Sequence, residues 1–386
     1  MKIACVVHRY GLDIAGGSET HCRHLAERLA SRHDVTVLTT CARDYVSWAN
    51  AYPPGETTIG PVRVHRFPVA RTRRIDRFRE ISERVFSGPA SEQEEEEWFR
   101  ENGPEVPELL AYLRDHGRDF DRILFWSFRY APVFFGLPLV ADRAILVPTA
   151  EEDPAIRLDV LSRFFAQPRG YLFLTPEEQQ LIQQRVPGEL PPSTTIGSGL
   201  DPAAGGNDGA LAGFDIPRPY ALYLGRVERN KGCETMLAFF ERYLADGGTP
   251  VPLVLAGPLF IPVPPHPLIK PLGFVPDAAR EALLAEARVL VMPSPYESLS
   301  MVLLEAWNHA VPALVNGRCQ VLKGQVRRAN GGLFYDHVGE FSEGLRWFLE
   351  QPEKARRLGE QGRGYVEREY RWPTVMSRVE AFLASV

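Results

Sequence analysis

The chain has 386 residues, of which 24% are charged and 45% are apolar, and its formal net charge at neutral pH is -5. This length exceeds what one hydrophobic core usually serves, so we expect two domains of about 180 residues each. The acidic balance argues against a dedicated nucleic-acid binder, and five scattered cysteines without a CxxC pair indicate neither a disulfide framework nor a zinc site.

The first half of the chain reads as one α/β domain. Residues 3–7 are short, β-branched and apolar, which predicts a buried first strand rather than a signal peptide. A glycine loop at 11–17 follows, then a helix that Ser18 is expected to cap, then a strand at 35–39. This order is the βαβ pattern of a parallel sheet. Further strands are predicted at 62–67, 122–127, 144–147 and 171–174.

The second half repeats this architecture. Proline and glycine concentrate between residues 187 and 219, which indicates a linker. Beyond it, strands and helices alternate again and a helical tail follows. Strands are predicted at 221–224, 252–256, 289–292 and 312–315, and helices at 233–244, 277–287, from about Ser300, and at 340–349, 352–369 and 373–383.

Two charged segments interrupt the first half. The basic residues 71–79 are predicted as a solvated helix face, and the acidic run 92–97 as a flexible loop. Docking of the longer basic segment 71–84 on anionic lipid is a hypothesis that we keep open. No stretch of about 20 uncharged residues could span a bilayer. We therefore expect a cytoplasmic protein, with at most peripheral contact at the inner face of the membrane.

Ligands of open parallel sheets bind outside the carboxyl ends of the strands. The loops at 11–17, 225–232 and 293–300 are therefore the predicted walls of a binding site. No GxGxxG follows a predicted strand and no GxxxxGK[ST] occurs, so a nicotinamide cofactor and a P-loop are not expected. Gly16 and Gly17 allow two interpretations. A simple loop into a helix is the commoner one, and the functional alternative is that the glycines let the backbone approach a ligand closely.

Two cations follow the strand at 221–224. Arg226 and Lys231 are suited to hold a diphosphate through charge-assisted hydrogen bonds, although a basic surface turn containing Arg229 would have the same composition. Their place directly after a predicted core strand favours the functional interpretation, because both cations could neutralise charge that develops on a departing diphosphate.

Two carboxylates follow the strand at 289–292. Glu297 and Glu305 stand eight positions apart, and glutamate pairs at any spacing are common on helices. Glu305 lies within an apolar stretch, however, where an unpaired carboxylate would be costly. A glycosidase pair would lie about 5–10 Å apart, whereas eight helical steps span roughly 12 Å. Holding ligand hydroxyls fits better, so these residues together indicate a nucleotide-sugar site.

With these residues in view, the chain resembles the retaining GT-B glycosyltransferases of family four over nearly its whole length. The resemblance rests on the segment Ala15-Gly-Gly-Ser-Glu19, the segments at 225–232 and 272–276, and above all the Glu-x7-Glu element at 297–305. It implies two Rossmann-like doubly wound parallel-sheet domains that face a cleft. The acceptor-side domain would span 1–190, the nucleotide-sugar domain 200–368, and a helix at 369–386 would cross back to the N-terminal domain.

The resemblance also implies roles for individual residues. Arg226 and Lys231 would grip the donor diphosphate, Glu297 would face the donor sugar and Glu305 would bind the ribose. Donor contacts are expected as well from Gly16, Gly17, Phe274, Val275, Ser298, Leu299, Ser300 and Met301.

The sequence departs from the family at Glu151. Many relatives carry a histidine after the corresponding strand, whereas this chain reads Thr149-Ala-Glu-Glu-Asp153. A carboxylate at 151 donates no proton at neutral pH unless its pKa is raised, so its contact with the donor sugar or acceptor would differ. No Asp-x-Asp occurs, and neither a metal nor a cofactor is expected besides the nucleotide-diphosphate sugar itself.

The sequence thus predicts a glycosyltransferase that moves a sugar, with retention, from a nucleotide-diphosphate sugar to an acceptor hydroxyl. The acceptor would be a carbohydrate, a lipid-linked molecule or a small molecule. Polysaccharide, glycolipid or glycosylated natural-product synthesis is the expected setting, by fold-level analogy. The alternatives are a catalytically silent relative that binds a nucleotide sugar, and a phosphorylase or epimerase of the same fold.

Overall fold

A computed structural model describes residues 1–14, 16–203 and 209–386. Ala15, within the predicted glycine loop, and residues 204–208, in the predicted linker, lie outside the described residues. The chain forms two compact units. Unit 1 contains Met1–Ile196 and Met376–Val386, and unit 2 contains Gly197–Val375.

Unit 1 is built on a sheet with the strand order β3-β4-β2-β1-β5-β6-β7-β8, in which only the β3–β4 pair is antiparallel. All the predicted strands are present. The strands β1, β5, β6 and β7 are mostly continuous apolar runs, which suit strands that are covered on both faces, whereas β4 alternates apolar and polar residues. The edge strands β3 and β8 were not predicted, since neither has an apolar pattern. The bounds are β1 Lys2–Val6, β2 Asp34–Thr40, β3 Gly55–Ile59, β4 Val62–Phe67, β5 Arg122–Trp126, β6 Ala144–Val147, β7 Gly170–Phe173 and β8 Ser193–Thr195.

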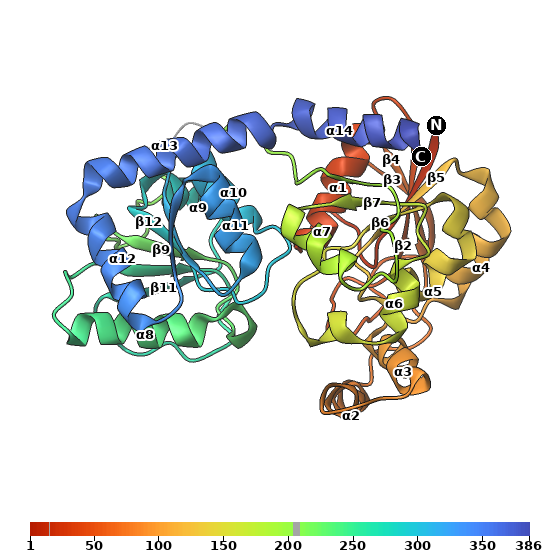
Figure 1. The fold of residues 1–386 in the computed structure, drawn as a ribbon, viewed down its shortest axis with the longest axis horizontal. Helices are drawn as coiled ribbons and strands as arrows, with labels where there is room; N and C mark the ends of the chain where they lie inside the picture. Colours follow the sequence, from red (N-terminus) through yellow and green to blue (C-terminus); the bar gives the residue numbers. More distant parts are fainter. Residues whose placement is uncertain (15, 204–208) are drawn as a thin grey trace. The chain divides into compact units, whose positions relative to one another are not determined.

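The α-helices of unit 1 connect these strands. Helices α2 and α3 pack against each other at the edge of the unit (Figure 1). The bounds are α1 Gly17–Leu29, α2 Ile75–Phe86, α3 Glu92–Asn102, α4 Pro107–His116, α5 Ala131–Gly136, α6 Val160–Phe165 and α7 Pro176–Gln183.

The prediction of a flexible loop at 92–97 was wrong, because these residues begin helix α3. Ser91 and Glu94 form a capping box, in which each side chain accepts a hydrogen bond from the other residue's backbone N–H. The acidic side chains of the first turn also suit the positive end of the helix dipole. Trp98 and Phe99 then bury the apolar face of the helix.

Unit 2 has a fully parallel sheet with the order β11-β10-β9-β12-β13-β14. Helices α8 and α12 pack together, as do α9 and α10, and the sheet lies between these pairs (Figure 1). The strand bounds are β9 Ala221–Leu224, β10 Leu253–Ala256, β11 Ile269–Gly273, β12 Val289–Met292, β13 Ala313–Asn316 and β14 Gly332–Tyr335. The helix bounds are α8 Cys233–Ala245, α9 Asp277–Glu286, α10 Met301–Asn308, α11 Gln320–Ala329, α12 Val338–Glu350 and α13 Pro352–Glu369.

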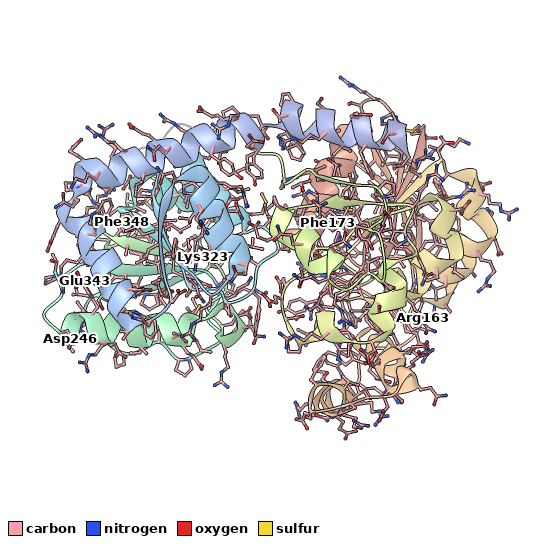
Figure 2. All side chains as sticks on the ribbon, in the orientation of Figure 1. Arg163, Phe173, Asp246, Lys323, Glu343 and Phe348 are labelled. Carbon is pink, nitrogen blue, oxygen red and sulfur yellow. The ribbon has the colours of Figure 1, made fainter. Side chains whose placement is uncertain are left out.

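The last helix is divided between the two units. Helix α13 packs on α10 and α11 of unit 2, whereas α14, Trp372–Ser385, contributes its residues from Met376 onward to unit 1. There the Glu380 carboxylate accepts a hydrogen bond from His33 Nε2 at 2.8 Å. Each unit has its own apolar interior, in which Figure 2 shows the fully buried Phe173 and Phe348.

The described residues contain neither a membrane-spanning helix nor a cluster of metal ligands. None of their helices is long and apolar enough to cross a membrane. In the same part of the chain, no group of three or more His, Cys, Asp or Glu side chains is arranged to hold a metal ion.

Candidate active site

The strand order of unit 2 reverses direction next to β9. The chain passes from β9 through α8 to β10 on one side of β9, and β12 pairs with β9 on its other side. The loops that follow β9 and β12 therefore leave the carboxyl edge of the sheet in opposite directions. Such a switch point is where doubly wound sheets bind ligands. The loop at 225–232 follows β9 and the loop at 293–300 follows β12.

Glycines allow the backbones at this edge to approach closely. Gly257 has a φ of 141°, and a Cβ there would lie 2.0 Å from the carbonyl oxygen of Gly225. Gly232 has a φ of 74°, and a Cβ there would lie 2.3 Å from the carbonyl oxygen of Pro293. Any other residue would force these backbones apart. The two glycines thus fix the loop at 225–232 against its neighbours.

Lys231 and Glu297 meet across the switch point. Lys231 Nζ donates to Glu297 Oε1 at 2.8 Å, and the two side chains are 27% and 12% exposed. The partly exposed ammonium remains within reach of a ligand. Arg226 lies earlier in the loop after β9, where its guanidinium pairs with Glu228 at 3.1 Å and is 42% exposed. The structure thus brings Lys231 and Glu297 into contact and places Arg226 on the same loop as Lys231.

The loop at 293–300 leads into helix α10. Ser300, at the start of this helix, makes no capping hydrogen bond with its side chain. Ser300 occupies the N-cap position with a φ of 67°, a left-handed conformation that is unusual for a residue with a side chain. Its buried hydroxyl has no partner among the described residues. Gln325 holds the loop from α11 by donating to the carbonyl oxygen of buried Leu299.

Glu305 lies within α10 and pairs with Arg280 of α9. Burial raises the pKa of Glu305, and Arg280 opposes that shift by stabilising the carboxylate. Glu281, next to Arg280, accepts a hydrogen bond from His309 at 2.8 Å. The sequence did not identify Arg280, because an arginine on a helix twenty-five residues away carries no local signal of this contact.

Exposed aromatic side chains gather in the loops at the same edge. Phe274 directly follows β11 and is 80% exposed, whereas the adjacent Val275 is buried. Phe260 lies in the loop after β10, and Tyr296 lies beside Glu297. Flat apolar faces next to cations and carboxylates suit a ligand that combines a base, a phosphate and hydroxyl groups. The remaining predicted donor contact, Met301, is the first residue of α10.

Unit 1 has a switch point of its own, between β1 and β5. His8 and Arg9 follow β1, and both contact Glu19 in the first turn of α1, with His8 Nε2 2.9 Å from Glu19 Oε1. Burial alone would raise the pKa of Glu19, but His8, Arg9 and Ser18 together lower it below its usual value. Burial lowers the pKa of His8. Glu19 is therefore a buried carboxylate that stays ionised.

The glycine pair lies beside this carboxylate. Gly16 is the N-cap of α1, and a Cβ there would lie 2.3 Å from Glu19 Oε2. Ser18, which was predicted to cap the helix, lies inside it and donates to Glu19 at 2.7 Å instead. Gly17 has open space where a Cβ would be. Gly16 and Gly17 are therefore in unit 1, apart in the chain from the other predicted donor residues.

Glu151 also belongs to unit 1, after β6. Burial alone would lower the pKa of Arg129, but the nearby carboxylates of Asp153 and Glu151 raise it. Glu178 accepts hydrogen bonds from the backbone N–H groups of Ala150 and Leu174, each at 2.6 Å. Burial raises the pKa of Glu178 to about 8. Glu178 thus fixes the backbone next to Glu151, and Glu151 lies within electrostatic reach of Arg129.

Three aromatic residues that the sequence did not indicate meet at this switch point. The His8 ring lies tilted against Tyr130 with ring centroids 3.7 Å apart, and Trp48 lies edge-on to both. Each comes from a different segment, so no motif links them. A histidine directly after the first strand, His8, could have indicated a functional site. A single histidine, however, is more often a packed residue than a functional one.

Comparisons with known proteins agree with this architecture. Residues 212–365 match the family model described as "Glycosyl transferases group 1". Alpha-maltose-1-phosphate synthase of Mycolicibacterium smegmatis is 26% identical over 251 residues, and the match spans 60% of each chain. The chain therefore spans about three fifths of the length of that curated relative.

Solved structures match over the whole chain. Sucrose-phosphate synthase from Thermosynechococcus elongatus has a TM-score of 0.72 at 17% identity, with 100% of this chain and 99% of that chain covered. The HepE protein of Anabaena, in complex with UDP-glucose, has a TM-score of 0.72 at 14% identity, with both chains fully covered. At such low identities these matches show the fold alone. The predicted fold, two Rossmann-like parallel-sheet domains of the GT-B type, is confirmed.

Proposed function

We propose that this protein is a glycosyltransferase, because residues 212–365 match the model of the glycosyl transferases group 1 family. It moves a sugar from a nucleotide-diphosphate sugar to an acceptor hydroxyl, with retention of anomeric configuration. The observation that carries the proposal is the contact of Lys231 with Glu297 across the switch point between β9 and β12. It places a cation suited to phosphate beside a carboxylate suited to sugar hydroxyls.

The chemistry requires charge stabilisation more than proton transfer from a side chain. Lys231 and Arg226 would neutralise the negative charge that develops on the departing diphosphate. The N-terminus of α10 lies at the same edge, and the first N–H groups of a helix, which lack intrahelical partners, favour phosphate. Glu297 would accept hydrogen bonds from donor-sugar hydroxyls, and Glu305 from the ribose. The HepE protein, which has the same fold, was solved with UDP-glucose, and this supports a nucleotide-sugar donor.

A panel of UDP-, GDP-, ADP- and dTDP-sugars tests the proposal. We expect release of the nucleoside diphosphate from at least one donor, and a product with the anomeric configuration of that donor in its NMR spectrum. An inverted product would contradict the retaining mechanism. Consumption of orthophosphate in place of an acceptor would instead indicate a phosphorylase. Donor binding without release of any nucleoside diphosphate would indicate a silent relative.

Peripheral membrane contact remains a prediction. The basic segment 71–84 could attract anionic lipid only through charges that internal carboxylates do not already neutralise. Co-sedimentation with vesicles that contain anionic lipid measures this directly. Recovery of the protein in the supernatant at low salt would remove the hypothesis.

A further inference from the structure

The basic segment 71–84 contains six arginines, and five of them pair with carboxylates. Each of the five guanidinium groups lies within 4.0 Å of an acidic side chain, so the segment is largely neutralised from within. The pairs are Arg71 with Glu101 and Glu105, Arg74 with Glu101, Arg77 with Glu80, Arg79 with Asp76 and Arg84 with Glu94. Arg73 is the exception, since none of the described residues gives it a carboxylate partner.

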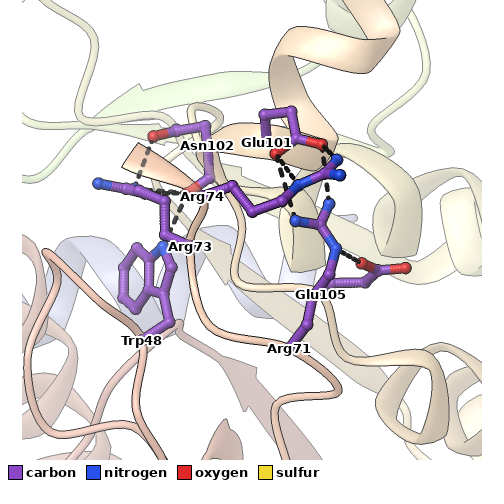
Figure 3. Close-up of polar contacts among 7 residues, drawn as sticks. All are labelled: Trp48, Arg71, Arg73, Arg74, Glu101, Asn102 and Glu105. Carbon is purple, nitrogen blue, oxygen red and sulfur yellow. Dashed lines mark hydrogen bonds and ion pairs between the residues drawn. The ribbon is translucent and has the colours of Figure 1, made fainter. Parts of the chain in front are cut away.

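Arg73 is held by neutral groups. Its Nε donates to the carbonyl oxygen of Asn102 at 3.0 Å, and its Nη2 donates to Asn102 Oδ1 at 2.8 Å. Its guanidinium carbon lies 5.0 Å from the ring centroid of Trp48 and 4.8 Å from that of Phe78. Figure 3 shows a terminal nitrogen of Arg73 directed away from the other labelled side chains. The cation is oriented, yet its charge is not compensated.

The position of Arg73 is at the switch point of unit 1. Trp48, on which the guanidinium lies, is 5.8 Å from His8 and 5.5 Å from Tyr130 between ring centroids. His8 follows β1 and Tyr130 follows β5, the two strands where the order of this sheet reverses. Doubly wound sheets bind ligands at this place. Arg73 and Tyr130 are both half-buried, so each keeps part of its side chain at the surface.

The nearby acids are already engaged. Asp44 accepts hydrogen bonds from Val46 N and Ser47 N and from the Ser47 hydroxyl. Glu19 is bound by His8 and Arg9, and Asp153 by Arg129. Burial lowers the pKa of Arg73, as expected for a cation that has lost solvent without gaining a carboxylate. An anion that binds here would recover this missing interaction.

We propose that Arg73 recognises an anionic group of the acceptor substrate, a phosphate or a carboxylate, with Trp48 and Tyr130 forming the aromatic surface beside it. The inference rests on the proposed glycosyltransferase function, since it assigns the chemical class of the acceptor. A guanidinium presents a planar fork of donors that matches both oxyanions. Arg73 is a specificity residue in this account, because the sugar that reacts would be attached to the bound anion.

The alternative is that Arg73 only joins the segment after β4 to the end of α3 through Asn102. Removing it would then lower stability and weaken all ligands alike. A specific role predicts that anionic compounds alone lose affinity. The test therefore compares anionic and neutral sugars on the same variants.

Calorimetric titrations of the full chain with glucose 6-phosphate, glucuronate and glucose make this comparison. The wild type should bind one of the two anionic sugars at least tenfold more tightly than glucose. Arg73→Gln should lose that preference, and Arg73→Lys should retain part of it because the charge remains. Arg77→Gln is the matched control, since Arg77 lies in the same segment but is exposed and paired with Glu80. Glucose 6-phosphate and glucuronate distinguish a phosphate from a carboxylate.

Two outcomes would overturn the proposal. One is a wild type that binds all three compounds alike, and the other is an Arg73→Gln variant that keeps the anion preference. If Arg73→Gln does not fold, Arg73→Lys decides instead. An Arg73→Lys variant that binds glucose more weakly and still keeps the full anion preference would also refute the proposal. Nucleoside diphosphate release, measured separately on the wild type, reports on the proposed function. Its failure would be distinguishable, because the anion titrations need no donor.

Discussion

The carboxyl edges of the two sheets both carry charged side chains, but these charges are compensated differently. In unit 2, Lys231 meets Glu297 and Arg226 meets Glu228, and these groups are partly exposed. In unit 1, Glu19 is buried with His8 and Arg9, whereas Arg73 has no carboxylate partner in the described part of the chain. Exposed ion pairs are weak and can exchange partners, whereas a buried pair is expensive to break. Unit 2 thus offers a ligand charged groups whose ion pairs can be exchanged. Unit 1 has a buried ion pair that stays in place and one cation, Arg73, without a carboxylate partner among the described residues.

The largest expected effect follows from removing a charge at the edge of unit 2. Lys231→Ala should lower turnover with the nucleotide-sugar donor by about 10²–10³-fold, because one preorganised group that stabilises the leaving charge is lost. Steady-state release of nucleoside diphosphate measures it. Lys354→Ala, an exposed lysine on α13, is the control and should keep wild-type turnover. Equal rates in the two variants would remove Lys231 from the site.

Breaking the buried pair of unit 1 should affect folding instead. Glu19→Gln should lower the free energy of unfolding at neutral pH by about 3 kcal/mol, because Arg9 is left buried without its carboxylate. Urea unfolding followed by fluorescence measures this loss. Ser18→Ala removes only one hydrogen bond to Glu19 and should cost much less.

The pH dependence of that stability has a defined sign. The pKa of Glu19 is lowered on folding, so its stabilising effect is present above the ordinary glutamate value of 4.5 and is lost as the pH falls below it. The lowered pKa of His8 adds a loss of stability that begins below 6.5. Glu19→Gln should remove the contribution of Glu19 to the slope below 4.5, but should keep the loss that begins below 6.5, because removing Glu19 lowers the pKa of His8 further. An unchanged acid slope would contradict the buried ion pair.

A third comparison concerns two glycines of unit 2, one at the carboxyl edge of the sheet and one inside a helix. Gly257→Ala should destabilise the protein by about 2 kcal/mol, because φ at this residue is 141° and the new Cβ would collide with Gly225. Thermal unfolding measures the change. Gly364→Ala is the matched substitution, since this glycine lies inside α13 with open space around it. That variant should be more stable by up to about 1 kcal/mol. Similar losses in both variants would refute the close approach of the two loops.

The smallest expected effect concerns the predicted ribose contact. Glu305→Gln should raise the KM for the donor about tenfold with little change in kcat, because one charge-assisted hydrogen bond is lost in ground state and transition state alike. Glu281→Gln is the control. Glu281 also pairs with Arg280 but is not a predicted ligand contact, so this variant should keep the wild-type KM. A fall in kcat at unchanged KM would move Glu305 from binding to chemistry.

The two sheet edges also differ in how far the sequence predicts their residues. The loops at 225–232 and 293–300 each directly follow a buried strand, so local patterns indicate Arg226, Lys231 and Glu297 as candidates. The aromatic and basic residues of unit 1, His8, Trp48, Arg73 and Tyr130, come from four separate segments. Only the folded sheet brings them together, so no motif predicted the group.

Local sequence patterns also gave wrong predictions where tertiary contacts determine the local structure. Ser18 and Ser300 are good capping residues by composition, yet Ser18 turns to Glu19 and Ser300 adopts a left-handed backbone. The acidic run at 92–97 suggested a loop because like charges repel. A capping box and the burial of Trp98 and Phe99 make it a helix.

The central claim is that Arg226 and Lys231 hold the diphosphate of the donor at the switch point between β9 and β12. Calorimetric titration with UDP, GDP, ADP and dTDP, on the wild type and on the double variant Arg226→Ala/Lys231→Ala, tests it most directly. At least one of these nucleotides should bind the wild type, and it should bind the double variant at least tenfold more weakly. A nucleotide that binds both proteins equally, or no binding by any of the four, would contradict it.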